Sequence, residues 1–425
     1  MSHTAQTLNT KRKFMSLKTL PLITTTSILS LALIGCGSDS GSSSSDNGGN
    51  DGTPVNTATF SESATWQVTN LTPDTATCYD FDTQAESSCD EDSWDLKFDN
   101  QARSVKLWSN SGDSGDGDGG VFGLLDWADL SRYTNATLDP DSSRDITSHY
   151  NEDRSGGIFD EEPWFEYNLQ DNHQLFPNNR VYLITTDNSS DMTDSSVQQP
   201  IYAVQITNYY DDAGTSGHPT IRWIDTALPN TAQTKTIDAS NHEDWVYFDL
   251  ATGQSSTDDD STWHIGFNRN NVILNGGDSG DSSVGGYLAA TPAGYYTTQE
   301  GADEEEPVVS KFTTDGSAAT LSNLTNTADY DTPTSASSWV VDSKGSDLNP
   351  AYTGSYPNLD YGWYTYNGMT HQLSAKPIDT AQGALIRSAE GNSYARVRLT
   401  EINYPDSTSY TPSSWTFELD IQPSS

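Results

Sequence analysis

The chain has few basic residues, few cysteines and almost no helical pattern. Lysine and arginine together number 20 against 60 aspartates and glutamates, which gives a formal net charge of −40 at pH 7. A field of this sign repels nucleic-acid phosphates and anionic lipid headgroups, so we expect neither as a partner. Helical periodicity is absent apart from a short stretch at residues 124–131, which argues against a helical fold.

The motifs of common enzyme classes are also absent. The sequence contains no GxSxG nucleophile elbow, no HExxH zinc motif, no CxxC pair and no phosphate-binding glycine loop. Carboxylates are abundant, but no two of them stand out by context as the acid and base of a glycosidase. We therefore expect a binding protein rather than an enzyme.

What the chain does contain is a series of short stretches in which apolar and polar side chains alternate. Its 11 Trp, 21 Tyr and 12 Phe fall in strand-like segments such as 93–99, 103–109, 180–186 and 200–208. Alternation of this kind is typical of strands with one buried face. Acidic chains that stay disordered lack it, so we predict an all-β fold of open-faced antiparallel sheets.

One pattern occurs twice in the chain. Residues 164–209 and 363–404 both contain an aromatic strand, a His-Gln-Leu triplet, an apolar strand and an Asn-Tyr end. The offset between matching residues stays between 195 and 199. A period this long indicates whole domains rather than solenoid repeats.

A second repeated block precedes the first in each half. Residues 93–98 and 262–267 both read as a Trp-containing strand, and a Gly-rich loop follows each of them. Two blocks in the same order predict a tandem duplication, with β domains at 59–226 and 234–425.

The N-terminal region lies outside this pattern. Basic residues at 11–13 precede an apolar segment at 20–34 that is too short and Thr-rich for a comfortable membrane span. The segment ends in Leu-Ile-Gly-Cys, which looks like the lipobox of bacterial lipoproteins. We predict a signal peptide at 1–35, with Met15 as an alternative start, and lipidation of Cys36.

The residues after the lipobox predict a tether. Residues 36–58 consist mainly of Gly, Ser, Asn and Asp and have no apolar period, which is typical of a flexible linker. By resemblance to other lipoproteins, glycine at position 37 indicates the outer membrane, on its periplasmic or its surface face.

Two further cysteines lie in a polar segment just before Trp94. Cys78 and Cys89 are 11 residues apart, a spacing that suits a disulfide in an exported protein. Two free thiols are the alternative.

The sequence resembles the HmuY-type haem-binding lipoproteins of bacterial outer membranes. The resemblance covers the second predicted domain almost entirely and the first more weakly. It rests on several segments in order: 234–240, 245–248, 263–267, the Gly-rich loop 275–286, Leu373-Ser374, Ile386-Arg387 with Gly391, and 395–399 before Tyr404.

This resemblance implies a right-hand-like β fold that clamps one haem edge-on between finger loops. It also implies axial ligation of the iron by His or Met side chains, which supply the lone pairs that haem iron needs. Apolar or aromatic walls would cover the macrocycle, and basic or hydroxyl groups would meet the propionates.

The first ligand position of the family lies in the connection after the Gly-rich loop. In the second domain this connection, at 311–345, has neither His nor Met, whereas the first domain has His149 there. The second ligand position falls near Tyr167 and Tyr366, which we take as haem-pocket candidates.

A histidine follows each of these tyrosines within a few residues. We predict His149 with His173 as the better ligand pair, and His371 with Met369 as the second. A structural histidine that bonds a strand edge or turn carbonyl is the alternative for His173 and His371.

The aspartates of the first Gly-rich loop raise the question of calcium. Asp113, Asp116 and Asp118 are closely spaced, but the spacing does not fit a DxDxDG loop. We prefer a turn in which glycine allows positive φ and a close approach of the backbone to its neighbour.

The resemblance implies capture of haem for iron acquisition, with a TonB-dependent outer-membrane receptor as a partner. An alternative from another class is a surface lipoprotein that has lost iron ligation and binds protein or glycan through an exposed aromatic sheet. A third hypothesis is a secreted hydrolase that uses two of the many carboxylates.

Overall fold

The computed structural model describes residues 58–90, 92–101, 104–189, 200–242, 244–259, 262–298, 305–316 and 320–424. The predicted signal peptide, Cys36 and nearly all of the tether lie outside these residues. Within the described part, no helix has the length and apolar character needed to cross a membrane.

The all-β prediction is confirmed, and every pair of strands is antiparallel. Helices are short and lie in the connections. The α-helices are α1 (Trp127–Leu130), α2 (Ile158–Glu161) and α3 (Leu321–Thr325). The 3₁₀ turns are η1 (Gly112–Ser114), η2 (Thr147–His149), η3 (Val309–Lys311), η5 (Thr327–Asp329) and η6 (Ala336–Ser338).

One lobe is built from both ends of the described chain, and we call it the terminal lobe (residues 58–153 and 346–424). Its five-stranded sheet has the order β1-β28-β27-β26-β6. These strands are β1 (Glu62–Val68), β6 (Gly120–Asp126), β26 (Gln382–Arg387), β27 (Tyr394–Asn403) and β28 (Ser414–Gln422). A second sheet, β3-β2-β4-β5, contains β2 (Thr75–Asp80), β3 (Ala85–Ser87), β4 (Leu96–Gln101) and β5 (Ser104–Ser109).

The other lobe contains residues 157–342, and we call it the central lobe. Its five-stranded sheet has the order β13-β12-β11-β10-β18. These strands are β10 (Val181–Thr185), β11 (Ile201–Tyr210), β12 (Ser216–Asp225), β13 (Gln233–Thr236) and β18 (Gly285–Ala290). A second sheet, β15-β14-β16-β17, contains β14 (Val246–Asp249), β15 (Gln254–Ser256), β16 (Ile265–Asn268) and β17 (Asn271–Leu274).

Each lobe has an apolar core that its two sheets share. In the terminal lobe Leu96 and Phe98 of β4 pack in the same cluster as Val397 and Phe417, and all four side chains are buried. In the central lobe Ile265 and Phe267 of β16 pack with Val204 in the corresponding way. The alternating apolar residues of the sequence therefore face the interior between the sheets.

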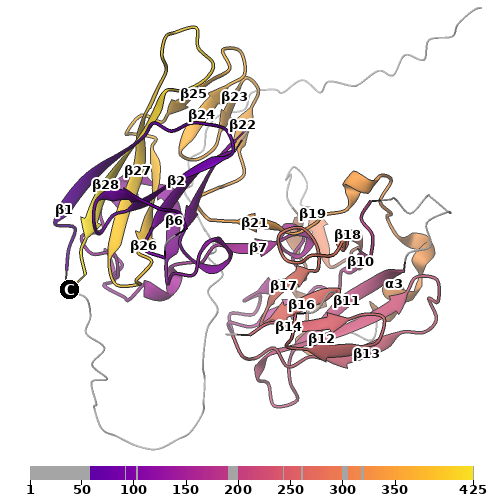
Figure 1. Ribbon diagram of the computed structural model, residues 1–425. Coiled ribbons are helices and arrows are strands. Elements are labelled where there is room, and N and C mark those ends of the chain that lie inside the picture. Colours follow the sequence, from indigo (N-terminus) through magenta and orange to yellow (C-terminus); the bar gives the residue numbers. More distant parts are fainter. Residues whose placement is uncertain are drawn as a thin grey trace, which may run out of the picture. The chain divides into compact units, whose positions relative to one another are not determined.

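The boundary predicted between residues 226 and 234 does not separate two sheets. The strands that flank it, β12 and β13, are hydrogen-bonded neighbours, with Thr220 opposite Thr236. The strands β1 and β6 pair with β28 and β26 from the far end of the chain, so indigo and yellow strands share one lobe in Figure 1. Each lobe thus combines one half of each predicted domain.

The two lobes nevertheless have the same strand order. β1, β26–β28 and β6 occupy in the terminal lobe the places that β13, β10–β12 and β18 occupy in the central lobe. If each predicted domain is taken as a unit, one half of it lies in the terminal lobe and the other half in the central lobe. The two domains thus exchange halves. The tandem duplication itself stays a prediction.

The chain passes between the lobes at two short strands, which we call the crossover strands: β7 (Arg154–Gly156) and β21 (Ser343–Gly345). They pair with each other antiparallel, with Ser155 opposite Lys344 (Figure 1). The two transitions between lobes are therefore joined to each other by a β ladder.

The remaining strands form hairpins and extensions. The two-stranded pairs are β8 (Phe165–Tyr167) with β9 (Leu175–Pro177), and β19 (Tyr296–Thr298) with β20 (Glu305–Pro307). A four-stranded sheet, which we call the finger sheet, has the order β22-β23-β24-β25. Its strands are β22 (Thr353–Ser355), β23 (Asn358–Asp360), β24 (Tyr364–Asn367) and β25 (Gln372–Ala375).

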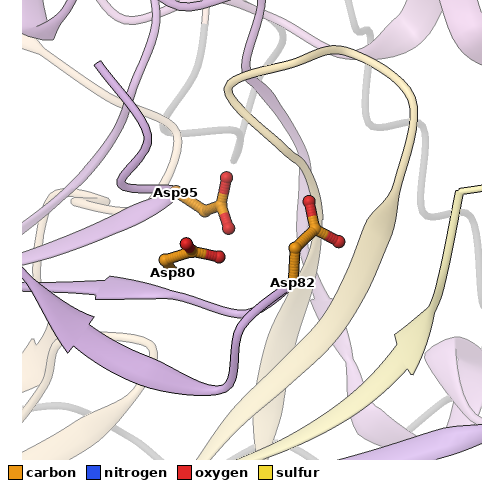
Figure 2. Close-up of side chains that lie close together, drawn as sticks. All are labelled: Asp80, Asp82 and Asp95. Atoms are coloured by element: carbon orange, nitrogen blue, oxygen red, sulfur yellow. The ribbon is translucent and has the colours of Figure 1, made fainter. Parts of the chain in front are cut away.

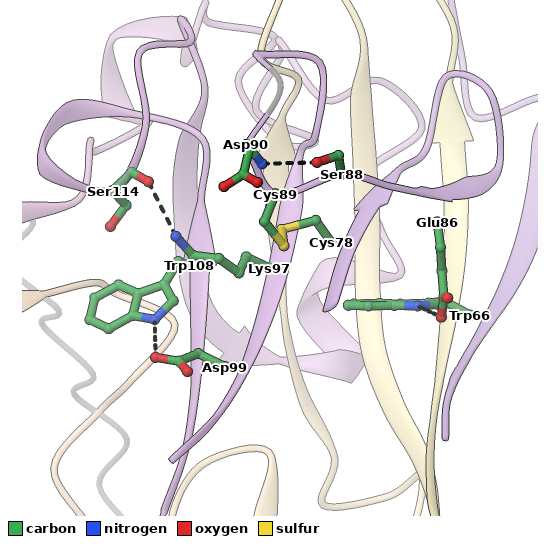
Figure 3. The surroundings of a disulfide bond; sticks show 10 residues. All are labelled: Trp66, Cys78, Glu86, Ser88, Cys89, Asp90, Lys97, Asp99, Trp108 and Ser114. Atoms are coloured by element: carbon green, nitrogen blue, oxygen red, sulfur yellow. Dashed lines mark hydrogen bonds between the residues drawn. A yellow bond between two sulfur atoms is a disulfide. The ribbon is translucent and has the colours of Figure 1, made fainter. Parts of the chain in front are cut away.

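The predicted disulfide between Cys78 and Cys89 is confirmed. It closes an 11-residue separation and lies in a small cluster with Trp94 and Trp108. Figure 3 shows the bridge together with Trp108. Cys78 is fully buried in β2. The bridge therefore ties the segment after β3 to β2, in the second sheet of the terminal lobe.

Replacing Cys78 and Cys89 together by alanine should lower the free energy of unfolding by about 2–3 kcal/mol, because the open loop regains entropy in the unfolded chain. Urea denaturation measures the change, and the wild-type chain in excess reductant is the control that should match it. Equal stability of the oxidised wild type and the double variant would contradict the prediction.

Cutting the chain between the two predicted domains should not separate them. A protease site inserted at the exposed Leu228 lies between β12 and β13. After cleavage both fragments should elute together in native gel filtration, because the β1–β28 and β10–β18 ladders join them. They should separate in denaturant, and separation under native conditions would show that the halves are not exchanged.

Candidate functional site

The Gly-rich loops hold the crossover strands. A carboxylate oxygen of Asp113 accepts the backbone N–H of Ser155, and Oδ2 of Asp278 accepts that of Lys344 at 2.7 Å. The two aspartates occupy matching places in the two repeats. The first carboxylate of each loop therefore accepts a hydrogen bond from a backbone N–H of a crossover strand.

Glycine permits this close approach. Gly112 and Gly277 have φ of +50° and +66°, and an added Cβ would lie 2.1 Å from the carbonyl oxygen of Asp153 and 1.9 Å from that of Asp342. These distances are far below van der Waals contact. The turn interpretation of the loops agrees with this geometry.

A buried aspartate precedes each crossover strand. Oδ2 of Asp153 accepts the backbone N–H of Ser109 at 2.9 Å, and Oδ2 of Asp342 accepts that of Leu274 at 2.8 Å. The two residues are 1% and 2% exposed. Burial raises the pKa of Asp153 to about 6 and that of Asp342 to about 6, even though hydrogen bonds favour the charged form.

Three further aspartates lie close together in the terminal lobe, as Figure 2 shows. One oxygen from each of Asp80, Asp82 and Asp95 lies within 4.8 Å of the others. The oxygens of Asp95 accept backbone N–H groups of Phe81 and Ala389, each at 2.8 Å. Burial raises the pKa of Asp95 to about 8. Asp95 thus joins β4 to the loop after β26, a structural role.

Two histidines predicted as haem ligands occupy equivalent hairpin turns. The hydroxyl of Tyr167 lies 2.9 Å from Nδ1 of His173, and the hydroxyl of Tyr366 lies 2.8 Å from Nδ1 of His371. Both histidines are exposed. Each hairpin therefore presents a Tyr–His pair at its tip, and the ring nitrogen Nε2 is left for another partner.

The turns fix the histidine backbones in the left-handed region. His173 has φ of +55° and His371 has φ of +57°, values that non-glycine residues adopt rarely. The amide of His173 donates to Oδ1 of Asn168 at 2.8 Å, and that of His371 donates to the carbonyl of Asn367 at 2.7 Å. The asparagine at the end of the preceding strand therefore organises each turn.

A tyrosine from the main sheet anchors the base of each hairpin. The amide of Leu175 donates to the hydroxyl of Tyr210 at 2.8 Å, and the amide of Leu373 donates to that of Tyr404 at 2.6 Å. A tyrosine at the end of the second repeat, and one directly after the end of the first, therefore hold the returning strand of each hairpin.

The terminal-lobe hairpin is extended. Twenty-one positions separate Asp342 from Trp363, whereas 11 separate Asp153 from Trp164. The additional chain forms β22 and β23 and turns a two-stranded hairpin into the finger sheet.

Met369 and three aromatic side chains surround His371. The hydroxyl of Tyr356 lies 3.4 Å from Sδ of Met369, and the rings of Tyr410 and His371 are 5.8 Å apart. Met369, Tyr356 and Tyr410 are 69%, 69% and 68% exposed. We call Tyr356, Tyr366, Met369, His371 and Tyr410 the tip cluster. Sequence reasoning found three of its members and missed Tyr356 and Tyr410.

His149 lies elsewhere. Its ring is 6.0 Å from that of Phe122. Phe122 lies opposite Leu385 in the β6–β26 ladder, and both pack in the apolar cluster that contains Leu130 of α1. The neighbours of Leu385 in β26 face the opposite side of the sheet, where Leu373 packs. His149 and the finger sheet therefore lie on opposite faces, and His173 belongs to the central lobe.

Comparison with known families supports the resemblance. Residues 241–418 match the model described as HmuY protein. This segment, which is less than half of the chain, is similar to the HmuY family. Among solved structures, the crystal structure of the Tannerella forsythia apo HmuY analog is similar at 15% identity, over 48% of this chain and 97% of that chain, with a TM-score of 0.13. No curated protein matches the sequence.

The HmuY-family segment does not coincide with one lobe. Its first part contains β14–β20 of the central lobe, and its last part contains the finger sheet and β26–β28 of the terminal lobe. A single match to the family is thus divided between two lobes.

Replacing Asp153 or Asp342 by asparagine should flatten the pH dependence of stability. Each carboxyl has a higher pKa in the folded protein, about 6, than in the unfolded chain, near 4. Its contribution to the free energy of unfolding is therefore complete below pH 4 and is lost as the pH rises through about 6. In each variant, the difference in the free energy of unfolding between pH 4 and pH 7 should shrink by on the order of 2–3 kcal/mol.

Urea unfolding at several pH values measures this change. Asparagine keeps an oxygen acceptor for the amide of Ser109 or Leu274, and Asp116→Asn, an exposed change in the same loop as Asp113, is the control. Parallel pH curves for the wild type and both buried-site variants would contradict the prediction.

Proposed function

We propose that this protein is a lipid-anchored capture protein that binds haem, or a similar flat ligand, for iron acquisition. The similarity of residues 241–418 to the HmuY family, which is associated with haem binding, supports this function. The observation that carries the proposal is the Tyr366–His371 pair at an exposed hairpin tip.

The pair suits iron because of its protonation geometry. When Nδ1–H of His371 donates to the hydroxyl of Tyr366, Nε2 is unprotonated and presents its lone pair. A hydrogen bond on the other nitrogen is the usual way in which a ligating histidine is oriented. In this tautomer His371 has the form that binds haem iron.

The rest of the tip cluster supplies suitable surroundings. The thioether of Met369 is exposed two residues away and is a ligand that haem iron accepts. Tyr356 and Tyr410 offer aromatic faces for a macrocycle and hydroxyls for its propionates.

We propose the equivalent pair in the central lobe as a weaker second site. Tyr167 and His173 repeat the geometry of the tip pair, but their hairpin has two strands and lacks the extension that carries Tyr356. His149 stays a ligand predicted from the sequence, and it would act separately from the tip cluster.

Anchoring through Cys36 would keep the binding site at the outer membrane, where a TonB-dependent receptor could accept the ligand. The alternative function is a surface lipoprotein that binds protein or glycan. Exposure of Tyr352, Tyr356 and Tyr410 on or beside the finger sheet favours this alternative as the second candidate.

Haemin titration of the full chain should produce a sharp Soret band that His371→Ala abolishes or shifts. Tyr366→Phe should weaken affinity by on the order of 10–100-fold while keeping the ligand, because it removes only the orienting hydrogen bond. A spectral change in Met369→Ala would show that the thioether sulfur is the second ligand of the haem iron.

His149→Ala is the control at the tip site, since its side chain lies on the other face of the sheet. A spectrum identical to that of free haemin would favour the interaction alternative. A spectrum that His149→Ala changes and His371→Ala does not would contradict the assignment of the site.

A further inference from the structure

A cavity of about 630 Å³, away from the tip cluster, is lined mostly by residues of the terminal lobe, with the crossover strand β21 and Glu161 of the central lobe at its margin. Lys106 of β5, Lys344 of the crossover strand β21 and Tyr364 at the start of β24 line it. His371 and Met369 are not among its lining residues, because the turn that carries them lies at the other end of β24.

One wall of the cavity is a row of tyrosines. The rings of Tyr361 and Tyr364 stack with centroids 5.1 Å apart and an angle of 13° between their planes. Tyr352 continues the row at 5.6 Å from Tyr361. Trp363 and Phe417, both buried, also line the space. Flat aromatic walls of this kind favour a planar ring as the occupant.

The charged groups at the cavity are mainly positive. Lys106 and Lys344 line it together with one carboxylate, Glu161. Within the part of the chain that the structure describes, neither lysine forms a salt bridge. Burial first and then the charge of Lys344 lower the pKa of Lys97, so the positive charges are close enough to repel each other.

This charge is unusual for the chain as a whole. The sequence has three acidic residues for each basic one. Here two lysines that form no salt bridge within the described residues lie beside an aromatic wall, with Asp99 opposite Lys106 in the β4–β5 ladder. An anion that carries an aromatic ring would satisfy both features at once, because lysine binds carboxylates by charge-assisted hydrogen bonds.

We propose that this cavity binds a planar aromatic carboxylate, with its ring against Tyr361 and Tyr364 and its carboxylate between Lys106 and Lys344. The site needs neither His371 nor iron, and it therefore goes beyond the function proposed above. The terminal lobe supplies most of its lining, and the segment that enters the finger sheet supplies the tyrosine wall.

The exchange of halves is what completes the cavity. Lys106 comes from the N-terminal part of the terminal lobe, whereas the tyrosines follow the second crossover strand. Residues 234–425 alone would therefore lack one of the two lysines.

The test uses 2-naphthoate as the probe and the full chain as the receptor, with calorimetry and tryptophan fluorescence as readouts. We expect binding that Lys106→Ala and Lys344→Ala each weaken by on the order of tenfold, through loss of one charge-assisted contact. Tyr361→Ala should weaken it as well. Lys311→Ala, an exposed lysine of the central lobe, is the matched control and should bind as the wild type does.

Two comparisons separate this site from the tip cluster. The neutral 2-naphthamide should bind at least tenfold more weakly than the carboxylate, and His371→Ala should leave naphthoate affinity unchanged while altering haemin binding. Failure of haemin to bind would leave the naphthoate result intact. Equal affinity for the amide, unchanged lysine variants, no binding of naphthoate, or loss of binding in His371→Ala would each overturn the proposal.

Discussion

The fold depends on the antiparallel pairing of two short strands at which the chain leaves one lobe and returns to it. Backbone groups at such a passage lie away from the main sheets and need partners of their own. β7 and β21 pair with each other, and Asp113 and Asp278 accept the amides of Ser155 and Lys344. Each Gly-rich loop therefore holds the crossover strand of its own half of the chain, and the β7–β21 ladder joins the two halves.

The exchange explains how two lobes with one strand order have different surfaces. The chain that enters the central lobe after β7 reaches Trp164 directly, whereas the chain that enters the terminal lobe after β21 forms β22 and β23 before Trp363. This local difference creates the finger sheet, the tip cluster and the tyrosine wall of the cavity. The apolar cores need no corresponding change, since insertions in surface connections cost little.

Much of the candidate site was predictable because its contacts are local. The Tyr–His pairs span five or six residues within a hairpin, and the repeated His-Gln-Leu triplet marked them. The disulfide was predictable from two cysteines 11 residues apart in one polar segment. Tyr410 and Lys106 were not found, because they approach the finger sheet from segments far away in sequence. Tyr356 was not found, because it lies in the β22–β23 turn of an extension that the first repeat lacks.

The sequence by itself determined the strands, their buried faces, the repeat and the hairpin turns, since alternation and turn residues act over a few positions. Only the tertiary structure decided which half pairs with which. β28 could satisfy its edge with β13 or with β1, because the two strands hold equivalent places in the same strand order. Which strands pair depends on contacts between residues far apart in sequence and on the β7–β21 ladder. The local alternation of apolar and polar residues carries no information about either.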